Sequence, residues 1–346
     1  MSGSLQTHLP LRVHGGADAA GAPRWDFSTC ANAAGPCPSA LAAVRAADPT
    51  RYPDPGATAV RAALAALHGV APWRILPAAS ASEFIQRITA VTGRLWPGDV
   101  SVPRHAYGDY AAAARAWARA VRVDGSADGQ ADAAPATLRW TADPSSPLGE
   151  DGALLPQGGA CPTVLDAVYA PLRLQGSSAW SAGPRDAVFV LHSPNKALGL
   201  TGIRSAYAVA PLAADYDVRA LCQALEAAAP SWPLSAHGDA MLMQWASPAV
   251  QDWVAASLAQ LADWKAQLQQ ALAQRGFALH ASVTPHGVVR PPAGFAPDAV
   301  ASLRQLGVAV RDTASFGLPG CWRVSAQPPG AQQALLRACD TLPRTG

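Results

Sequence analysis

The chain of 346 residues contains 50% hydrophobic and 14% charged residues, and its formal net charge is +2. This composition is typical of a globular protein with one large domain or two, and it gives no reason to expect binding to nucleic acid or to an acidic membrane surface. No run of about 18 apolar residues could span a bilayer, and the first residues lack the apolar segment of a signal peptide, so we expect a cytoplasmic location.

The six cysteines and eight histidines are dispersed along the chain, with no CxxC or HxxxH pattern. Such spacing favours buried reduced thiols over a disulfide framework. It also gives no indication of a metal site. We therefore expect neither zinc chemistry nor structural disulfides.

The first two thirds of the chain alternate between strands and helices after an irregular stretch of about 50 residues. That stretch cannot build a core of its own, so we expect it to lie over the body of the protein as an arm. Apolar patterns predict amphipathic helices over 57–67 and 84–92 and a loop over 124–135. The segments predicted as strands are 74–77, 100–103, 137–140, 161–166, 187–191 and 206–210. This alternation predicts an α/β fold with a mostly parallel sheet.

The last hundred residues predict a smaller α+β domain. A long helical region runs from residue 240 to about residue 275, and a terminal helix begins at Gln332. Between them the pattern predicts strands over 277–283, 287–290 and 322–325, a strand that ends at Arg311, and a helix over 298–306. We expect an N-terminal arm (1–50) that joins the small domain and the active site, a large domain (51–245) and a small C-terminal domain (246–346).

The stretch from Ser193 to Tyr207 interrupts this pattern directly after the strand at 187–191. It holds Lys196 among small and apolar residues, and Arg204 follows between glycine-rich positions. Lysine forms Schiff bases, and apolar or cationic surroundings lower its pKa enough to free the amine. Arg204 and the hydroxyl of Ser193 could bind a phosphate. The alternative is a βα turn with two solvated cations.

Several polar side chains follow predicted strands. Ligands bind beyond the carboxyl ends of the strands in sheets of this kind. Asp166 ends the strand at 161–166, where its carboxylate could pair with a protonated heterocycle; its alternative role is to cap the next turn. We expect five residues to meet at the carboxyl ends of the strands: Ser82, Tyr107, Ser146, Asp166 and Lys196.

The segment from Ala78 to Glu83 joins a strand to a helix through small residues. A helix that begins there would present free backbone N–H groups to a phosphate, and Ser80 and Ser82 could add hydroxyls. The alternative, which this segment alone favours, is ordinary capping with Ser80 as the N-cap and Glu83 three residues on.

Four segments carry a resemblance to a known family: His14–Gly16, Ser28–Gly35, Arg51–Pro55 and Ser193–Arg204. With the upstream residues Asp166 to Tyr169, they resemble fold-type-I enzymes that use pyridoxal 5′-phosphate (PLP), of the class I/II aminotransferase superfamily. The resemblance spans nearly the whole chain. Within the superfamily those four segments carry a narrower similarity, to the threonine-phosphate decarboxylases of cobalamin biosynthesis, which neighbour the histidinol-phosphate aminotransferases.

The resemblance implies PLP as the cofactor and assigns roles by position. Lys196 is similar to the lysine that holds PLP covalently and later moves protons. Asp166 is similar to the carboxylate that pairs with the ring nitrogen, and Tyr169 to the residue that hydrogen-bonds the ring oxygen. The other residues implied to contact the cofactor are Ala81, Ser82, Tyr107, Ser146, Ser193, Arg204 and Tyr52. The resemblance places Tyr52 in the site of a partner subunit, which implies a homodimer with shared sites.

The resemblance also implies a small phosphorylated amino acid as the substrate. Arg323 is similar to the arginine that clamps a substrate carboxylate through a bidentate pair. The residues implied to gather the phosphate and the carboxylate of the substrate are His14, Gly15, Asn32, Arg311 and Arg323.

The chain departs from the usual family pattern at several positions. Ser146 stands where the family has an asparagine, and its shorter side chain could lose the direct bond to the ring oxygen. Cys30 and Ala33 replace an asparagine and a proline, Asn195 stands before the lysine where Ser or Thr is common, and Ser80 replaces a glycine.

The leading hypothesis from the sequence is decarboxylation of L-threonine O-3-phosphate to (R)-1-amino-2-propanol O-2-phosphate. An alternative is aminotransfer from a phosphorylated amino compound such as histidinol phosphate, because the same cofactor site serves both reactions and only the orientation of the reacting bond decides between them. A third hypothesis is a non-catalytic binding homologue that kept the fold.

Overall fold

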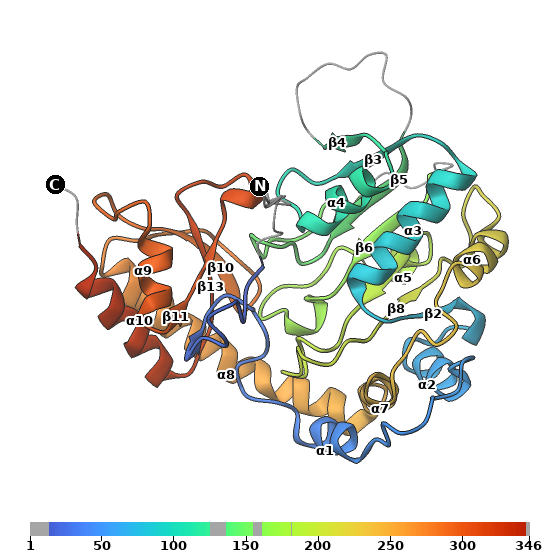
Figure 1. The fold of residues 1–346 in the computed structure, drawn as a ribbon, viewed down its shortest axis with the longest axis horizontal. Helices are drawn as coiled ribbons and strands as arrows, with labels where there is room; N and C mark the ends of the chain where they lie inside the picture. The colour runs from blue at the N-terminus through green and yellow to red at the C-terminus, as the bar shows by residue number, and fades with distance from the viewer. Residues whose placement is uncertain (1–13, 125–135, 155–160, 181, 344–346) are drawn as a thin grey trace, which may run out of the picture.

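The computed structural model describes residues 14–124, 136–154, 161–180 and 182–343. A larger body surrounds a seven-stranded sheet, and a smaller body surrounds a four-stranded sheet (Figure 1). The loop predicted at 124–135 lies almost entirely outside the described residues. Within the described ranges, no helix combines the length and the apolar character needed to cross a membrane.

The large sheet confirms the α/β prediction. Its strand order is β2-β8-β7-β6-β5-β3-β4, and the pairs from β7 to β4 are parallel. The strands are β2 (Ile75–Ala78), β3 (Asp99–Val102), β4 (Val121–Val123), β5 (Ala136–Ala142), β6 (Thr163–Asp166), β7 (Phe189–His192) and β8 (Ala206–Val209).

Strand β8 is antiparallel to both of its neighbours. A parallel return to the sheet needs a crossover, usually a helix, whereas an antiparallel return needs only a loop. The stretch between His192 and Ala206 contains no helix. The lysine loop is therefore the direct connection between two adjacent strands.

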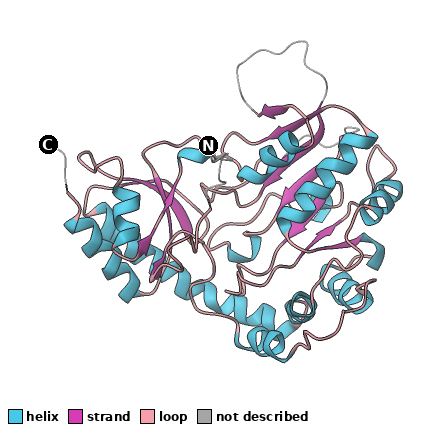
Figure 2. Cartoon of the chain, viewed as in Figure 1, coloured by secondary structure: helices cyan, strands magenta, loops and turns pink. Residues whose placement is uncertain are grey.

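Helices cover both faces of the large sheet (Figure 2). The helices of this body are α1 (Pro38–Ala46), α2 (Thr58–His68), α3 (Ala81–Leu95), α4 (Gly108–Ala116), α5 (Ala182–Arg185), α6 (Val218–Ala227) and α7 (Ala236–Trp245), with short 3-10 helices η1 (Pro72–Arg74) and η2 (Ala170–Leu172). Successive strand residues point to opposite faces. Val164 and Phe189 accordingly pack with α3, α4 and α6, while Leu165 and Val190 pack with α1, α2 and α7.

The small body contains α8 (Pro248–Ala273), α9 (Ala299–Gln305), the 3-10 helix η3 (Ala314–Phe316) and α10 (Pro329–Thr341). Its four-stranded antiparallel sheet has the order β12-β13-β10-β9. The strands are β9 (Ala278–Leu279), β10 (His286–Arg290), β12 (Arg311–Asp312) and β13 (Trp322–Ser325). This α+β arrangement agrees with the sequence prediction.

The N-terminal arm connects the two bodies. Strand β1 (Trp25–Asp26) pairs in parallel with β11 (Val308–Ala309) of the small body. Farther along, the backbone N–H of Asn32 donates to Lys196 O at 2.8 Å, and α1 packs against α7. The arm thus has one short strand and one helix, which the sequence pattern did not indicate.

Three predicted elements differ from the structure. The strand expected to end at Arg311 is two short strands, β11 and β12, which belong to different sheets. The helical region at 240–275 is two helices, because Pro248 lacks an N–H and fits only the first turn of a helix. The strand at 277–283 is only the two-residue β9, since the hydroxyl of Ser282 binds Thr284 and His286 O and so forms a local turn in place of a ladder.

Helix α8 contributes to two hydrophobic cores. Val254 and Leu261, which extend from the first half to the middle of the helix, belong to the core of the large body, whereas Leu268 and Leu272 near its C-terminal end belong to that of the small body. We propose that the domain boundary lies within α8 rather than at residue 245.

Candidate active site

Lys196 lies in the loop between β7 and β8, at the carboxyl end of the parallel strands. The loop begins with turn hydrogen bonds from Leu198 N to Pro194 O (2.9 Å) and from Leu200 N to Asn195 O (2.8 Å). Gly199 has a φ of +65°, and a Cβ there would lie 2.7 Å from Gly35 O of the arm. Glycine at this position allows the arm to pack directly against the lysine loop.

Asp166 ends β6, beside β7. One of its carboxylate oxygens accepts a hydrogen bond from Tyr110 Oη at 2.6 Å, and the other accepts one from Val168 N at 3.0 Å. The second contact is the capping role considered for this residue. Tyr110 was not anticipated, although it lies three residues after Tyr107 and therefore on the same side of α4.

The charges of Lys196 and Asp166 influence each other. Burial lowers the pKa of Lys196, and the nearby Asp166 carboxylate opposes that shift. Burial raises the pKa of Asp166, while the bonds from Tyr110 and Val168 and the charge of Lys196 lower it. The Lys196 amine also lies 5.4 Å from the centroid of the Tyr169 ring. An amine with a lowered pKa beside a bound carboxylate can act as a nucleophile and as a proton carrier.

Helix α3 begins at the carboxyl end of β2. Ser80 caps it, because the Ser80 hydroxyl accepts from Glu83 N at 3.0 Å, which confirms the capping alternative. The N–H groups of Ala81 and Ser82 lie in the first turn, where an anion is stabilised. The Ser82 hydroxyl donates to Asp109 at 2.6 Å and lies 3.4 Å from Tyr107 Oη.

The remaining residues of the predicted phosphate site are on the lysine loop. The Ser193 hydroxyl is buried and lies 3.1 Å from Asn195 Oδ1 and 3.4 Å from Ser205 O. Arg204 is exposed near the end of the loop. Together with the amine, the carboxylate, the tyrosines and the start of α3, these groups form a donor set that fits PLP.

Two arginines of the small body are directly opposite each other. Arg311 on β12 and Arg323 on β13 are cross-strand partners, and both are buried. Arg323 donates from Nη2 to Ser28 O at 2.8 Å, and its buried Nε has no partner among the described residues. Arg311 donates from Nη2 to Ser315 Oγ at 2.7 Å. Such a pair is suited to a carboxylate or a phosphate.

The structure gives Ser146 a different contact from the one implied by the family resemblance. Its hydroxyl accepts from Arg323 Nη1 at 3.0 Å. Ser146 was expected among the cofactor-binding residues. The Ser146 hydroxyl thus helps to hold the Arg323 guanidinium. A serine side chain is also shorter than that of the asparagine usual in the family, and both facts argue against a direct bond from Ser146 to the ring oxygen of the cofactor.

Asn32 also differs from its predicted role in substrate binding. Its side chain is buried and donates from Nδ2 to Ala197 O at 3.0 Å and to Ser257 Oγ at 2.8 Å. Its Oδ1 accepts from Ala34 N at 3.0 Å. Both amide protons are therefore used within the protein, which favours a role in holding the lysine loop over contact with a substrate.

The other N-terminal residues approach the site. His14 is exposed, with its ring centroid 6.3 Å from that of Tyr107. A Cβ on Gly15 would lie 2.5 Å from Ser28 O, so glycine is required for this close packing. Cys30 has a φ of 59°, a conformation that favours asparagine or glycine and gives a backbone reason for the asparagine usual in the family.

Tyr52 does not join this group within one chain. Its side chain is 77% exposed and stacks on the exposed Trp232, with a centroid separation of 4.3 Å and an interplanar angle of 22°. An exposed tyrosine in a defined orientation leaves the family-derived prediction, a contact to the site of a partner subunit, open.

A buried polar cluster adjoins the start of the lysine loop. The Tyr207 hydroxyl accepts from Trp245 Nε1 at 2.9 Å and lies 2.9 Å from His68 Nε2. The Tyr207 hydroxyl can therefore donate its proton to His68 Nε2. In that arrangement His68 is neutral and carries its proton on Nδ1. Burial lowers the pKa of His68 to about 4. The ring of His192, the residue before Ser193, stacks on Tyr207 at 5.0 Å.

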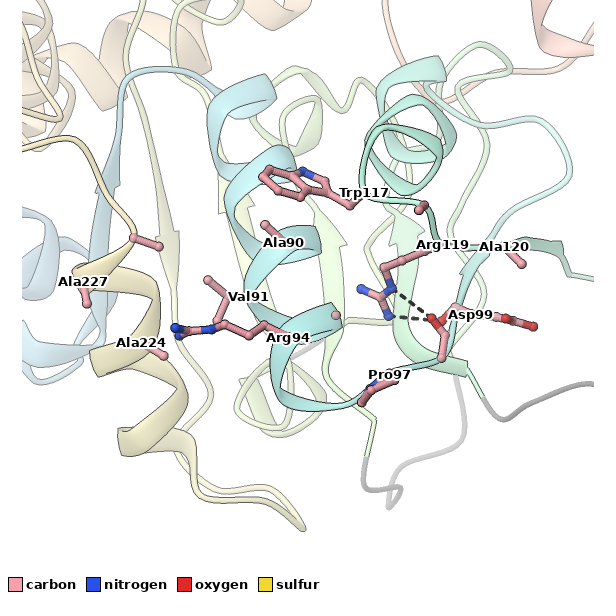
Figure 3. Close-up of a pocket in the computed structure, with 14 residues that line it drawn as sticks. Ala90, Val91, Arg94, Pro97, Asp99, Trp117, Arg119, Ala120, Ala224 and Ala227 are labelled. Atoms are coloured by element: carbon pink, nitrogen blue, oxygen red, sulfur yellow. Dashed lines mark hydrogen bonds between the residues drawn. The ribbon is translucent and has the colours of Figure 1, made fainter.

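A large open cavity lies away from all of these residues. It has a volume of about 830 Å³ and lies between the C-terminal ends of α3 and α6 and the start of β3 (Figure 3). Arg94, Trp117 and Arg119 line it, and none of the predicted site residues does. The chemistry described above belongs to the opposite ends of the strands.

Comparisons with known proteins agree with this geometry. A family model for aminotransferases of class I and II matches residues 155–342. A histidinol-phosphate aminotransferase from Ruegeria pomeroyi is 30% identical over 336 residues, which cover 90% of this chain and 89% of that protein.

Two solved structures are similar in fold. The histidinol-phosphate aminotransferase of Sinorhizobium meliloti, determined in complex with PLP, has a TM-score of 0.72 and 19% identity over 91% of this chain and 90% of its own. The L-threonine-O-3-phosphate decarboxylase of Porphyromonas gingivalis has a TM-score of 0.69 and 20% identity over 91% of this chain and 98% of its own. At these identities the likeness to both structures concerns the fold alone.

Proposed function

Because the chain belongs to the aminotransferase class I and II family and uses PLP as its cofactor, we propose that it is an aminotransferase for a phosphorylated amine of the histidinol-phosphate type. The observation that carries the proposal is the meeting of Lys196 and Asp166 at the ends of β7 and β6, with a buried arginine pair provided by the small body. The curated relative with 30% identity, a histidinol-phosphate aminotransferase, supports this reaction over the decarboxylation favoured by the sequence.

The residues of the site would hold the cofactor at both ends. Lys196 would bind it covalently, Asp166 would pair with the ring nitrogen, and Tyr169 would reach the ring oxygen. The start of α3, with Ser193 and Arg204, would take its phosphate. When bound, PLP supplies an electron sink that stabilises negative charge on the carbon next to the substrate amine.

The protein then has to move a proton. Lys196 Nζ, with its lowered pKa, would accept the proton from the substrate carbon and return it elsewhere on the conjugated system. Burial raises the pKa of Asp166, and the bonds from Tyr110 and Val168 N oppose that shift; as a carboxylate, Asp166 would keep the ring nitrogen protonated. Tyr107 would lie against the ring.

The substrate anion would be held by Arg311 and Arg323. The unpartnered Nε of Arg323 offers a donor that the protein does not use within the described residues. His14 and Gly15 approach the same region from the arm. We also propose a homodimer in which Tyr52 reaches the neighbouring site, which its exposure in the single chain supports.

The test measures glutamate formation by PLP-loaded protein from histidinol phosphate, with 2-oxoglutarate as the amino acceptor. We expect turnover, and conversion of the cofactor to its amine form when the acceptor is left out. Lys196→Ala should lose both signals. Turnover that survives in Lys196→Ala would contradict the proposed role of the lysine, and a yellow protein without any amino transfer would contradict the reaction.

A second candidate is decarboxylation of L-threonine O-3-phosphate. The N-terminal segments from His14 to Gly16 and from Ser28 to Gly35 resemble that family, and the Porphyromonas gingivalis decarboxylase has a similar fold. Release of carbon dioxide from that substrate, without loss of the cofactor aldehyde, would favour this candidate. A protein that binds no PLP chromophore would instead indicate a non-catalytic homologue.

A further inference from the structure

The 3-10 helix η3 places an aromatic ring next to both buried arginines. Phe316 is 8% exposed, and its ring centroid lies 5.0 Å from Cζ of Arg311 and 5.7 Å from Cζ of Arg323. A guanidinium within about 6 Å of a ring centroid is attracted by the negative face of the ring. One phenyl ring therefore contacts both members of the pair.

The arginine pair needs such a contact. Arg311 and Arg323 are directly opposite each other on β12 and β13, and like charges at opposed positions repel. Burial lowers the pKa of Arg311, and the charge of Arg323 lowers it further. Attraction to the ring of Phe316 offsets part of this repulsion before any anion arrives.

The backbone of the Phe316 turn is itself fixed. Phe316 N donates to Thr313 O at 2.9 Å, and the Thr313 hydroxyl lies 2.7 Å from Leu318 O and 2.8 Å from Cys321 O. Ser315 in the same turn accepts the bond from Arg311 Nη2 at 2.7 Å. The turn therefore orients both the ring and one of the guanidinium groups.

A histidine of the large body holds this turn from across the domain junction. His105 Nδ1 lies 2.8 Å from Phe316 O, and because a carbonyl only accepts, Nδ1 must carry the proton. A Cβ on Gly317 would lie 3.6 Å from the same nitrogen. His105 is two residues before Tyr107, which we expect to lie against the cofactor ring.

We propose that Phe316 is a positioning residue for the anion-binding arginines, and that His105 sets its place from the large domain. The inference rests on the proposed function in taking Arg311 and Arg323 as the residues that bind the substrate anion. The bond from His105 to Phe316 links the segment beside the cofactor to the segment that holds the substrate.

The test uses PLP-loaded protein and inorganic phosphate as the probe, because the cofactor then fills its own phosphate site. Phosphate binding is measured by calorimetry and by the change in cofactor absorbance, and PLP affinity is measured separately. We expect Phe316→Leu to weaken phosphate binding by about fivefold or more while PLP affinity changes less than about twofold. Phe316→Tyr, which keeps the ring, should restore binding.

The second pair of variants probes the link. His105→Ala should weaken phosphate binding in the same direction and raise KM for the amine substrate more than it lowers kcat. His105→Asn should recover most of the loss, because its amide can still donate to Phe316 O. Trp73→Leu is the matched control, since Trp73 also contacts an arginine, Arg219 at 4.1 Å, but lies before β2 at the opposite end of the sheet.

Three results would overturn the inference: no phosphate binding by the wild type, unchanged phosphate binding in Phe316→Leu, or equal losses of phosphate and PLP affinity in Phe316→Leu and His105→Ala. If Phe316→Leu does not fold, the comparison of His105→Ala with His105→Asn decides. Failure of aminotransfer from histidinol phosphate would refute the proposed function while leaving the phosphate measurements to judge Phe316 and His105.

Discussion

The buried amide of Asn32 gives the clearest quantitative prediction. It connects the arm to the lysine loop through Ala197 O and to helix α8 through Ser257 Oγ, and it accepts from Ala34 N. Asn32→Ala removes all three bonds and leaves Ala197 O without this donor. The substitution therefore separates a role in holding the loop from a direct contact with the substrate.

The expected magnitude follows from these contacts. A buried hydrogen bond contributes about 1 kcal/mol net, and an acceptor left without a partner costs more. Because Asn32→Ala loses three hydrogen bonds, we expect it to lower the free energy of unfolding by about 2–4 kcal/mol. In Asn32→Ala, Ser257 keeps its bond to Val254 O within α8. Ser257→Ala removes that bond and the bond from Asn32 and should cost about 1–2 kcal/mol, and the double variant should be less destabilised than the sum of the two by about 1 kcal/mol.

The assay is urea unfolding of the wild type, the two single variants and the double variant, monitored by circular dichroism at one protein concentration. PLP affinity of each protein is measured by titration. Because Asn32 bonds to the backbone of the residue after Lys196, we expect weaker PLP binding in Asn32→Ala. Unfolding energies that are equal within about 0.5 kcal/mol, with a raised KM for the substrate, would refute this reasoning. That result would restore Asn32 as a substrate contact.

Three further predictions concern single contacts. Ser146→Ala removes the bond to Arg323 and should raise KM for the substrate about three- to tenfold, with the cofactor absorbance spectrum unchanged. Trp232→Ala removes the stacking partner of Tyr52 and should weaken PLP affinity by about two- to tenfold in titrations, if Tyr52 completes the neighbouring site. Burial holds the pKa of His68 in the folded chain at about 4, below its usual value of 6.5. As pH falls, the unfolded chain therefore takes up a proton on His68 before the folded chain does. Between about pH 6.5 and 4, the free energy of unfolding of the wild type should fall by up to about 3 kcal/mol more than that of His68→Gln, as measured by urea unfolding.

Each of these has a contradicting outcome. A shifted cofactor spectrum in Ser146→Ala would show that the serine does contact the ring oxygen. Unchanged PLP affinity in Trp232→Ala would separate the exposed stack from cofactor binding; Trp117→Ala, at another exposed tryptophan, is the control. Equal pH slopes in wild type and His68→Gln would exclude His68 as the source of the acid sensitivity.

The sequence predicts well what is decided locally. The strand before Lys196 and the cap at Ser80 depend on neighbouring residues, and both occur in the structure. The mostly parallel sheet follows from the order of its elements along the chain. The predicted ends of helices are wrong where one residue interrupts an otherwise helical pattern, as Pro248 does between α7 and α8.

The contacts that the sequence does not predict join residues far apart along the chain. Asn32 and Ser257 are 225 residues apart, Ser146 and Arg323 are 177 apart, and the bond from His105 to Phe316 O spans 211 positions. No periodicity or spacing connects such positions, because they meet only after the domains have packed. The type of a polar residue suggests its chemistry, whereas its partner is set by the fold.

Helix α8 has a practical consequence for recombining this enzyme with its relatives. Its 26 residues span about 39 Å at the usual rise per residue, and its two ends belong to different cores. A chimera joined at residue 245 would combine Met241 and Trp245 of one parent with Val250 and Val254 of the other, inside a single packed core. An exchange of C-terminal segments that is joined past the middle of α8, between Leu261 and Leu268, would leave the buried residues of the large core to one parent, and in the small core it would mix only Phe27 of the arm with the other parent.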